Sequence, residues 1–290
     1  MAEPLPVCHL NGAWPELRDA RISPLDRGFL YADAVYEVIP VFAGRPFRFA
    51  EHFDRLDASL AAIRMRSPHD RNAWRALLRE LIERNGGGDQ YVYLQVSRGA
   101  EYGRNHAPLP DVTPTVFAFC APLPRASAEQ RERGLACVTA EDTRWARCDI
   151  KSVALLANVL LRQQAVDAGA QETILLRDGL LTEASSSAVH AVIGGTLLTP
   201  PRSARILPGT TRTVVEELAD RCGIPRIDRG VTESELRGAS EILISAATRA
   251  VSSVTRLDGA PVGDGRPGPV WRRLDAAFDA LVRELAGQEW

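Results

Sequence analysis

The chain has 290 residues, of which 45% are hydrophobic and 25% charged, and its formal net charge is -2. This length suffices for one or two domains with a large core. The balanced charge argues against a nucleic-acid partner, and no run approaches the roughly 20 apolar residues of a membrane-spanning helix. The first residues lack the basic and apolar regions of a signal peptide, so we expect a cytoplasmic protein. The five cysteines and five histidines show no metal-ligand spacing, so we expect reduced thiols and no metal.

The N-terminal part of the chain mixes strand and helix patterns. Residues 34–42 are rich in β-branched and aromatic side chains, which is typical of a strand. Apolar residues recur at three- and four-residue steps over 50–65 and again over 72–83, which predicts two helices. Two further strands are expected at 91–96 and 112–120.

Residues 122–133 are rich in proline, alanine and charge, and we expect them to link two domains that cover 1–121 and 134–290. The second part again combines helical periodicity with paired strands around glycine turns. Its predicted elements are a strand at 135–140, a helix at 153–168, hairpins over 173–182 and 188–198, a helix at 210–222, a strand at 241–245 and a helix at 269–286. The mixture predicts an α/β (α+β) fold of two domains.

All but one of the 35 Lys and Arg residues are arginine, and the exception is Lys151. Arginine stays protonated, whereas lysine can lose its proton and condense with a carbonyl group. Lys151 lies just before a predicted helix, at a junction of the kind that often carries functional side chains. We therefore interpret it as a candidate Schiff-base lysine, with Arg144 and Arg147 as neighbours that favour its neutral amine. The alternative is a lysine without a function.

Two segments of the second half could bind a cofactor. Glu183 follows a hairpin strand, and a carboxylate there can stabilise a protonated ring nitrogen, although it could equally be an ordinary turn carboxylate. Residues 207–212 open the predicted helix at 210–222, where Gly209 permits close backbone approach. Thr210 and Thr211 add hydroxyls beside helix N–H groups, an arrangement typical of anion binding and also of a simple helix cap.

A third candidate site is the polar loop over 99–110. Arg104 and His106 lie two residues apart in it, and two such donors can bind a carboxylate together. A solvated basic loop is the alternative interpretation.

Taken together, these segments resemble the class IV aminotransferases, the fold-type IV pyridoxal phosphate (PLP) enzymes, and among them the bacterial D-amino acid aminotransferases. The resemblance covers nearly the whole chain in one order. It includes LDRG at 25–28, VYEV at 35–38, EHFDRL at 51–56, VSRG at 96–99, RNH at 104–106, RCDIKS at 147–152, TE at 182–183 and GTTR at 209–212. The RCDIKS run is the most specific of these motifs.

The resemblance implies a two-domain fold, PLP as cofactor, and transamination between a D-amino acid such as D-alanine and a 2-oxo acid such as 2-oxoglutarate or pyruvate. It further implies a homodimer, because the Arg and His of the family's carboxylate trap come from the neighbouring subunit. The residue roles that it implies are Lys151 as the Schiff-base lysine and proton carrier, Glu183 at the pyridine nitrogen, Arg55 with Thr210 and Thr211 at the phosphate, and Tyr36, Arg104 and His106 at the substrate carboxylate.

The sequence departs from the family pattern in three places. Residues 32–34 read ADA where relatives commonly have GDG, Ala188 replaces an asparagine, and residues 245–248 lack two hydroxyls that often assist the phosphate. Alternatives on the same fold are an aminodeoxychorismate lyase, a branched-chain L-specific transaminase and an (R)-amine transaminase. A PLP-binding protein without turnover is the alternative outside enzymes.

Overall fold

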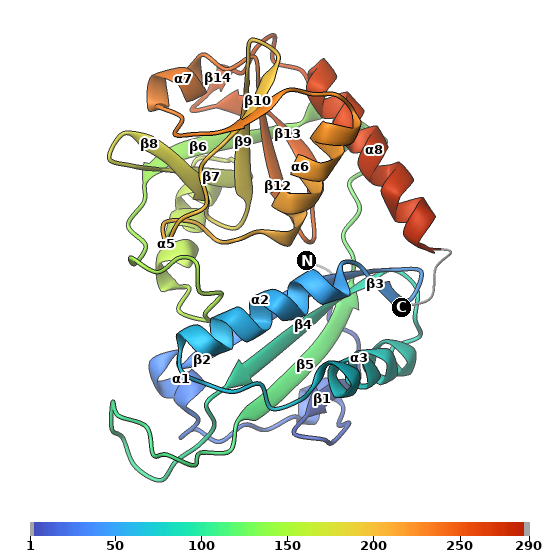
Figure 1. Ribbon diagram of the computed structural model, residues 1–290, viewed down its shortest axis with the longest axis vertical. Coiled ribbons are helices and arrows are strands. Elements are labelled where there is room, and N and C mark those ends of the chain that lie inside the picture. Colours follow the sequence, from blue (N-terminus) through green and yellow to red (C-terminus); the bar gives the residue numbers. More distant parts are fainter. Residues whose placement is uncertain (1–2, 287–290) are drawn as a thin grey trace. The chain divides into compact units, whose positions relative to one another are not determined.

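In the computed structural model, which describes residues 3–286, the chain divides into two units, each with its own sheet (Figure 1). Of the described residues, 3–124 and 150–154 form the N-terminal unit, and 125–149 and 155–286 form the C-terminal unit. The N-terminal unit therefore includes a short segment from the middle of the sequence. The domain limits that we predict at 121 and 134 do not set this segment apart, and they stay a prediction.

Five antiparallel strands and two long helices build the N-terminal unit. The strands are, in spatial order, β1 (Cys8–Leu10), β5 (Thr115–Pro122), β4 (Gln90–Ser97), β2 (Ala34–Phe42) and β3 (Arg45–Pro46). Helices α2 (Phe49–Ala62) and α3 (Arg71–Arg84) share one apolar core with the sheet, and the short helices η1 (Leu17–Asp19) and α1 (Arg27–Tyr31) precede β2.

Strand alternation decides which residues of β2 enter that core. Val35, Ile39 and Val41 are fully buried in it, because every second side chain of a strand faces the same way. Glu37 shares their face and is also fully buried, whereas Tyr36 lies on the other face and is half-buried. A buried carboxylate in an apolar row requires a partner.

The C-terminal unit has a nine-stranded sheet whose pairs β10–β11, β13–β6 and β6–β7 are parallel. Its strands are, in spatial order, β11 (Arg226–Asp228), β10 (Thr196–Thr199), β9 (Ala188–Ile193), β12 (Glu241–Ala246), β13 (Ala250–Leu257), β6 (Leu135–Glu141), β7 (Glu172–Arg177) and β8 (Leu180–Ala184), with β14 (Ala260–Pro261) paired to β13. Its helices are α4 (Ala128–Arg133), α5 (Leu156–Asp167), α6 (Thr210–Arg221), α7 (Glu233–Arg237) and α8 (Pro269–Ala286). Helix α5 packs on β6 and β7, while α6 and α8 lie side by side (Figure 1).

The mixed α/β class that we predict from the sequence is confirmed, and the predicted helices and strands appear within a few residues of their expected limits. The strand expected from 112 begins at Thr115, directly after Pro114, which has no N–H for the ladder. The helix expected from 153 begins at Leu156, because the residues before it pair with β2. Helix α4 lies in the expected linker, and strand β13 was not predicted. None of the helices within residues 3–286 is long and apolar enough to cross a membrane.

Candidate active site

Lys151 lies in the short segment that runs beside β2. Its carbonyl accepts a hydrogen bond from the Tyr36 N–H (2.9 Å), and its own N–H donates to the Ser59 hydroxyl on α2 (3.2 Å). Two residues further on, the Val153 N–H donates to the Ala34 carbonyl (3.1 Å). The sheet and a helix thus hold both backbone groups of Lys151, so its side chain extends from a fixed point.

The amine of Lys151 contacts an aromatic row on the outer face of the sheet. Its Nζ lies 4.2 Å from the centroid of the Tyr36 ring, a favourable position for a cation. The Tyr36 ring stacks on Tyr93, which stacks on Phe119, with centroid separations of 5.6 and 5.2 Å. Burial, with a smaller contribution from Tyr36, raises the pKa of Tyr93 to about 12. Two candidates that the sequence singles out, Lys151 and Tyr36, are therefore direct neighbours.

Arg55 on α2 is bound by the buried carboxylate of β2. Its Nε and Nη2 donate to the two oxygens of Glu37 at 2.8 and 2.7 Å, and the His52 ring lies 2.7 Å from Glu37 Oε2. Burial alone would raise the pKa of Glu37, but Arg55, assisted by His52, lowers it to about 2. Burial lowers the pKa of His52. The ionised Glu37 therefore compensates the charge of Arg55 and orients its guanidinium.

Glu183 belongs to a buried charge network in the C-terminal unit. It lies on β8, because this strand continues past Thr182, where the sequence predicts its end. Its carboxylate forms an ion pair with Arg144. Both its oxygens also accept from the Leu207 N–H at 3.2 Å. Burial raises the pKa of the Glu183 carboxyl, while Arg144 and the Leu207 N–H oppose this shift by favouring the ionised form. A protonated nitrogen next to Glu183 would favour ionisation further.

Asp142 holds Arg144 in place. It accepts from Arg144 Nε and Nη2 at 2.9 and 2.8 Å and from the Thr182 hydroxyl at 2.9 Å. Burial would raise its pKa, but the bonds from Arg144 and Thr182 lower it to about 2. Arg147 instead pairs with Asp149 near the surface. Arg144 and Arg147 are thus bound to carboxylates, and their expected effect on the Lys151 amine stays a prediction.

Helix α6 begins where the sequence predicts it. Gly209 is its N-cap and has no side chain to accept from the first N–H groups of the helix. Thr210 and Thr211 form the first turn, and Thr211 is buried. Because a helix N-terminus carries partial positive charge, this turn suits an anion. The Leu207 N–H, just before the turn, is the group that binds Glu183, so the two candidates of this unit are joined by a short loop.

Arg104 and His106 are exposed on the loop that follows β4. The Arg104 guanidinium lies 5.1 Å from the centroid of the Tyr31 ring, and the His106 ring lies 5.5 Å from the same centroid. Their contacts within the chain are thus with helix α1, whereas Tyr36 contacts Tyr93 and Lys151. Their role as a common carboxylate trap stays a prediction.

The fold groups the candidates by unit. Tyr36, Arg55, Arg104, His106 and Lys151 belong to the N-terminal unit, and Glu183, Thr210 and Thr211 to the C-terminal unit.

Sequence reasoning missed Glu37, Asp142 and the pairing of Arg144 with Glu183. For Glu37 a signal exists, since it is a charged residue at a core-facing position of a β-rich run. For the ion pair of Arg144 and Glu183 no local signal exists, because its partners are far apart in the chain.

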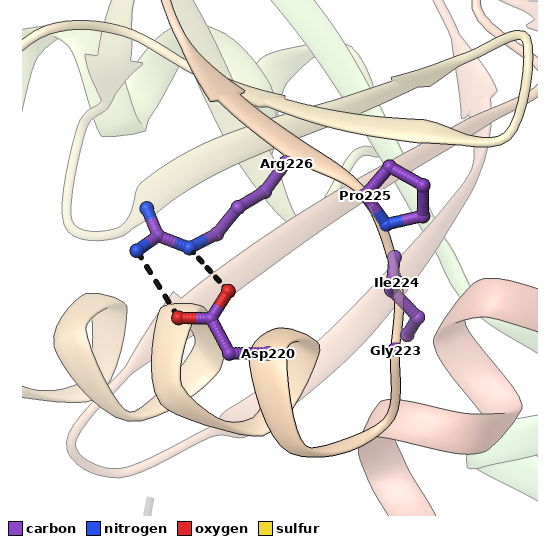
Figure 2. A pocket seen from close by; sticks show the side chains of 5 residues that line it. All are labelled: Asp220, Gly223, Ile224, Pro225 and Arg226. Atoms are coloured by element: carbon purple, nitrogen blue, oxygen red, sulfur yellow. Dashed lines mark hydrogen bonds and ion pairs between the residues drawn. The ribbon is translucent and has the colours of Figure 1, made fainter.

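An open surface pocket lies where α6 ends and β11 begins, lined by Asp220, Gly223, Ile224, Pro225 and Arg226 (Figure 2). Arg226 Nε donates to Asp220 Oδ1 at 2.9 Å. No candidate residue lines this pocket. Within residues 3–286, no group of three or more His, Cys, Asp or Glu side chains is arranged to hold a metal ion.

The profile of the family described as "Amino-transferase class IV" matches residues 34–257. The chain belongs to this family, as the motifs around Lys151 predict, and members of the family are transaminases that use PLP.

Relatives and solved structures match nearly the whole chain. The D-alanine aminotransferase of Bacillus licheniformis is 38% identical over 95% of this chain and 97% of its own length. The D-alanine aminotransferase of Listeria innocua is 39% identical over 97% of this chain and 98% of its own. The branched-chain amino acid aminotransferase of Escherichia coli superposes with a TM-score of 0.89 at 26% identity, covering 96% of this chain and 94% of the other. A second branched-chain amino acid aminotransferase, solved with pyridoxamine 5'-phosphate, also superposes with a TM-score of 0.89 at 26% identity.

Proposed function

We propose that this enzyme is a PLP-dependent D-amino acid aminotransferase, which moves an amino group between a donor of the D-alanine type and a 2-oxo acid. The observation that carries the proposal is the only lysine of the chain, held at both backbone groups beside β2 with its amine over Tyr36. The relatives named D-alanine aminotransferase, 38% and 39% identical over nearly the full length, support the choice of donor.

The residues present fit the cofactor. Lys151 would hold PLP covalently, and Glu183 would bind its ring nitrogen, because a buried carboxylate whose pKa is raised gains most from a cationic neighbour. Arg55 and the first turn of α6, with Thr210 and Thr211, would bind the phosphate. When bound, PLP draws electrons away from the substrate Cα and makes its proton removable.

The side chains of this chain then have distinct tasks. The Lys151 amine would take the proton from Cα and return one to the cofactor. Tyr36, which contacts that amine, would help to bind the substrate carboxylate. Glu37 would keep Arg55 in position, since it binds the guanidinium through two hydrogen bonds.

Arg104 and His106 would bind the substrate carboxylate in a homodimer. Their exposure leaves them accessible to a second copy. Helix α5 adds support for a dimer, because Leu156, Val159 and Leu160 are 73%, 59% and 60% exposed on it. An apolar helix surface of this kind is typical of a protein interface.

Mixing the purified holoenzyme with D-alanine and L-alanine separately, and following the cofactor absorbance, tests the proposal. D-Alanine should convert the cofactor to its amine form, and L-alanine should not. A lyase would react without a 2-oxo acid acceptor, and a PLP-binding protein would show no change. Product formation should therefore depend on added 2-oxoglutarate or pyruvate.

The structural likeness to branched-chain aminotransferases favours one second candidate, an L-specific enzyme for branched-chain amino acids. The same assay with L-leucine separates the two. Conversion by L-leucine and not by D-alanine would replace the first proposal by the second.

A further inference from the structure

A buried arginine connects helix α1 with the loop that carries Arg104 and His106. Arg27 is the first residue of α1 and is 3% exposed. Its Nη1 donates to the backbone carbonyl of Asn105 (2.7 Å), and its Nη2 donates to that of His106 (2.9 Å). Arg27 therefore holds the backbone of the two residues that follow Arg104.

The same guanidinium binds two carboxylates. Its Nε donates to Asp33 Oδ2 (2.9 Å), and its Nη1 donates to Glu101 Oε1 (2.5 Å). The other oxygen of Glu101 accepts from the Leu109 N–H (2.9 Å), so the beginning and the end of the loop are tied together. Only a planar group with several fixed donors can bind four acceptors in this way, which a lysine could not do.

The side chains of the loop also rest on helix α1. Tyr31, one turn after Arg27, has the Arg27 guanidinium 4.6 Å from its ring centroid and the Arg104 guanidinium 5.1 Å away. The His106 ring lies 5.5 Å from the same centroid. Helix α1 thus contacts both side chains, and Arg27 holds the backbone that carries them.

We propose that Arg27 is a positioning residue, which orders the loop so that Arg104 and His106 are already arranged to bind a carboxylate. Ordering an exposed loop costs conformational entropy, and a loop ordered before the substrate arrives does not incur this cost on binding. The inference rests on the proposed function, since it takes the substrate carboxylate as the ligand of Arg104 and His106.

The test compares Arg27→Gln with Arg98→Gln, a matched control. Arg98 binds the same Asp33 at 2.7 and 3.0 Å and the Ile63 carbonyl at 2.7 Å, but it donates to neither loop carbonyl. In the holoenzyme, Arg27→Gln should raise KM for D-alanine about tenfold or more and change kcat much less, since the ground state and the transition state both lose the interaction. Arg98→Gln should leave KM within about twofold of the wild type.

Hydrogen exchange of the loop gives a second readout that does not depend on activity. The peptide covering 101–110 should exchange about tenfold faster in Arg27→Gln, while the peptide covering β4 keeps its protection. Glu101→Gln serves if Arg27→Gln fails to fold, because it keeps the shape of the side chain and weakens the same contacts. It should act in the same direction with a smaller effect.

Loop exchange equal to that of the wild type in the folded variant would overturn the proposal. An equal rise of KM in Arg27→Gln and Arg98→Gln would also overturn it. If the wild-type holoenzyme does not transaminate D-alanine, the proposed function fails, and the exchange of the loop still decides whether Arg27 orders it.

Discussion

Replacing Glu183 by glutamine separates the electrostatic role of this residue from its structural role. The change keeps the size of the side chain and removes its charge. The glutamine cannot form the ion pair with Arg144. The contacts of Glu183 with the Leu207 N–H, at 3.2 Å, are long even in the wild type. Arg144 keeps two hydrogen bonds to Asp142.

The loss of folding stability should be small. A buried charge left without a partner costs about 3–5 kcal/mol, but Arg144 keeps its ion pair with Asp142, a carboxylate that also pairs with the half-buried Arg177. Losing one hydrogen bond to a charged group costs about 1.5–3 kcal/mol. Burial raises the pKa of Glu183, so removing its charge also removes a desolvation cost, which offsets part of the loss. We expect the free energy of unfolding of the apoprotein to fall by about 1–2 kcal/mol.

The loss of activity should be larger. An opposite charge nearby shifts a pKa by about 1–3 units, and the neutral amide would lower the pKa of the ring nitrogen by that much. One unit corresponds to about 1.4 kcal/mol, or a factor of about ten in rate. The half-reaction with D-alanine should therefore slow by about tenfold to a thousandfold while PLP stays bound.

Urea unfolding of the apoprotein, cofactor titration and single-turnover absorbance measure the three quantities. Glu51→Gln is a matched control, because Glu51 forms an ion pair with Arg48 at 2.8 Å and its side chain is 39% exposed. It should change stability by less than about 1 kcal/mol and leave the half-reaction unchanged. An unchanged half-reaction in Glu183→Gln would refute the assignment of Glu183 to the ring nitrogen.

Three further predictions concern single residues. Lys151→Arg should bind no PLP covalently and have no transaminase activity, and full activity in this variant would contradict the mechanism. Borohydride reduction of the wild-type holoenzyme should label only Lys151 among the side chains. Arg104→Ala should lower kcat/KM for D-alanine about tenfold to a few hundredfold. In tagged heterodimers of Arg104→Ala with Lys151→Ala, about one active site per dimer should return. Heterodimers no more active than the Arg104→Ala homodimer would place the loop in its own subunit's site or away from the substrate. Burial, with a contribution from Arg212, lowers the pKa of His190 to about 3, so the unfolded state binds a proton that the folded state does not, and stability is lost as the pH falls from about 6.5 towards 3. His190→Gln should reduce the slope of unfolding free energy against pH by about 1.4 kcal/mol per unit between pH 6 and 4. An unchanged slope would show that His190 binds its proton in the folded state as readily as in the unfolded state, against the lowered pKa.

Most elements of the fold could be predicted because their signals are local. The strand at 34–42 and the helices over 50–65 and 72–83 have strong periodicity, and the structure forms them as β2, α2 and α3. Strand β13 was missed because serine, threonine and arginine interrupt its apolar residues. Helix α4 is short, and its signal is the capping box of Ser127 and Gln130 rather than apolar periodicity.

The sequence by itself determined the chemistry that the chain offers: a single amine at Lys151, a carboxylate at Glu183, a helix that opens with Gly209, and a loop with Arg104 and His106. These are properties of residue types and short spacings, and the order of the motifs indicated the family. Only the tertiary structure decided what each group contacts. Glu37 binds Arg55, Asp142 and Glu183 share Arg144, and Arg27 holds the loop, and these partners are up to 79 residues apart. Local patterns cannot specify such contacts, because they depend on which strand face and which helix face meet after the chain has folded.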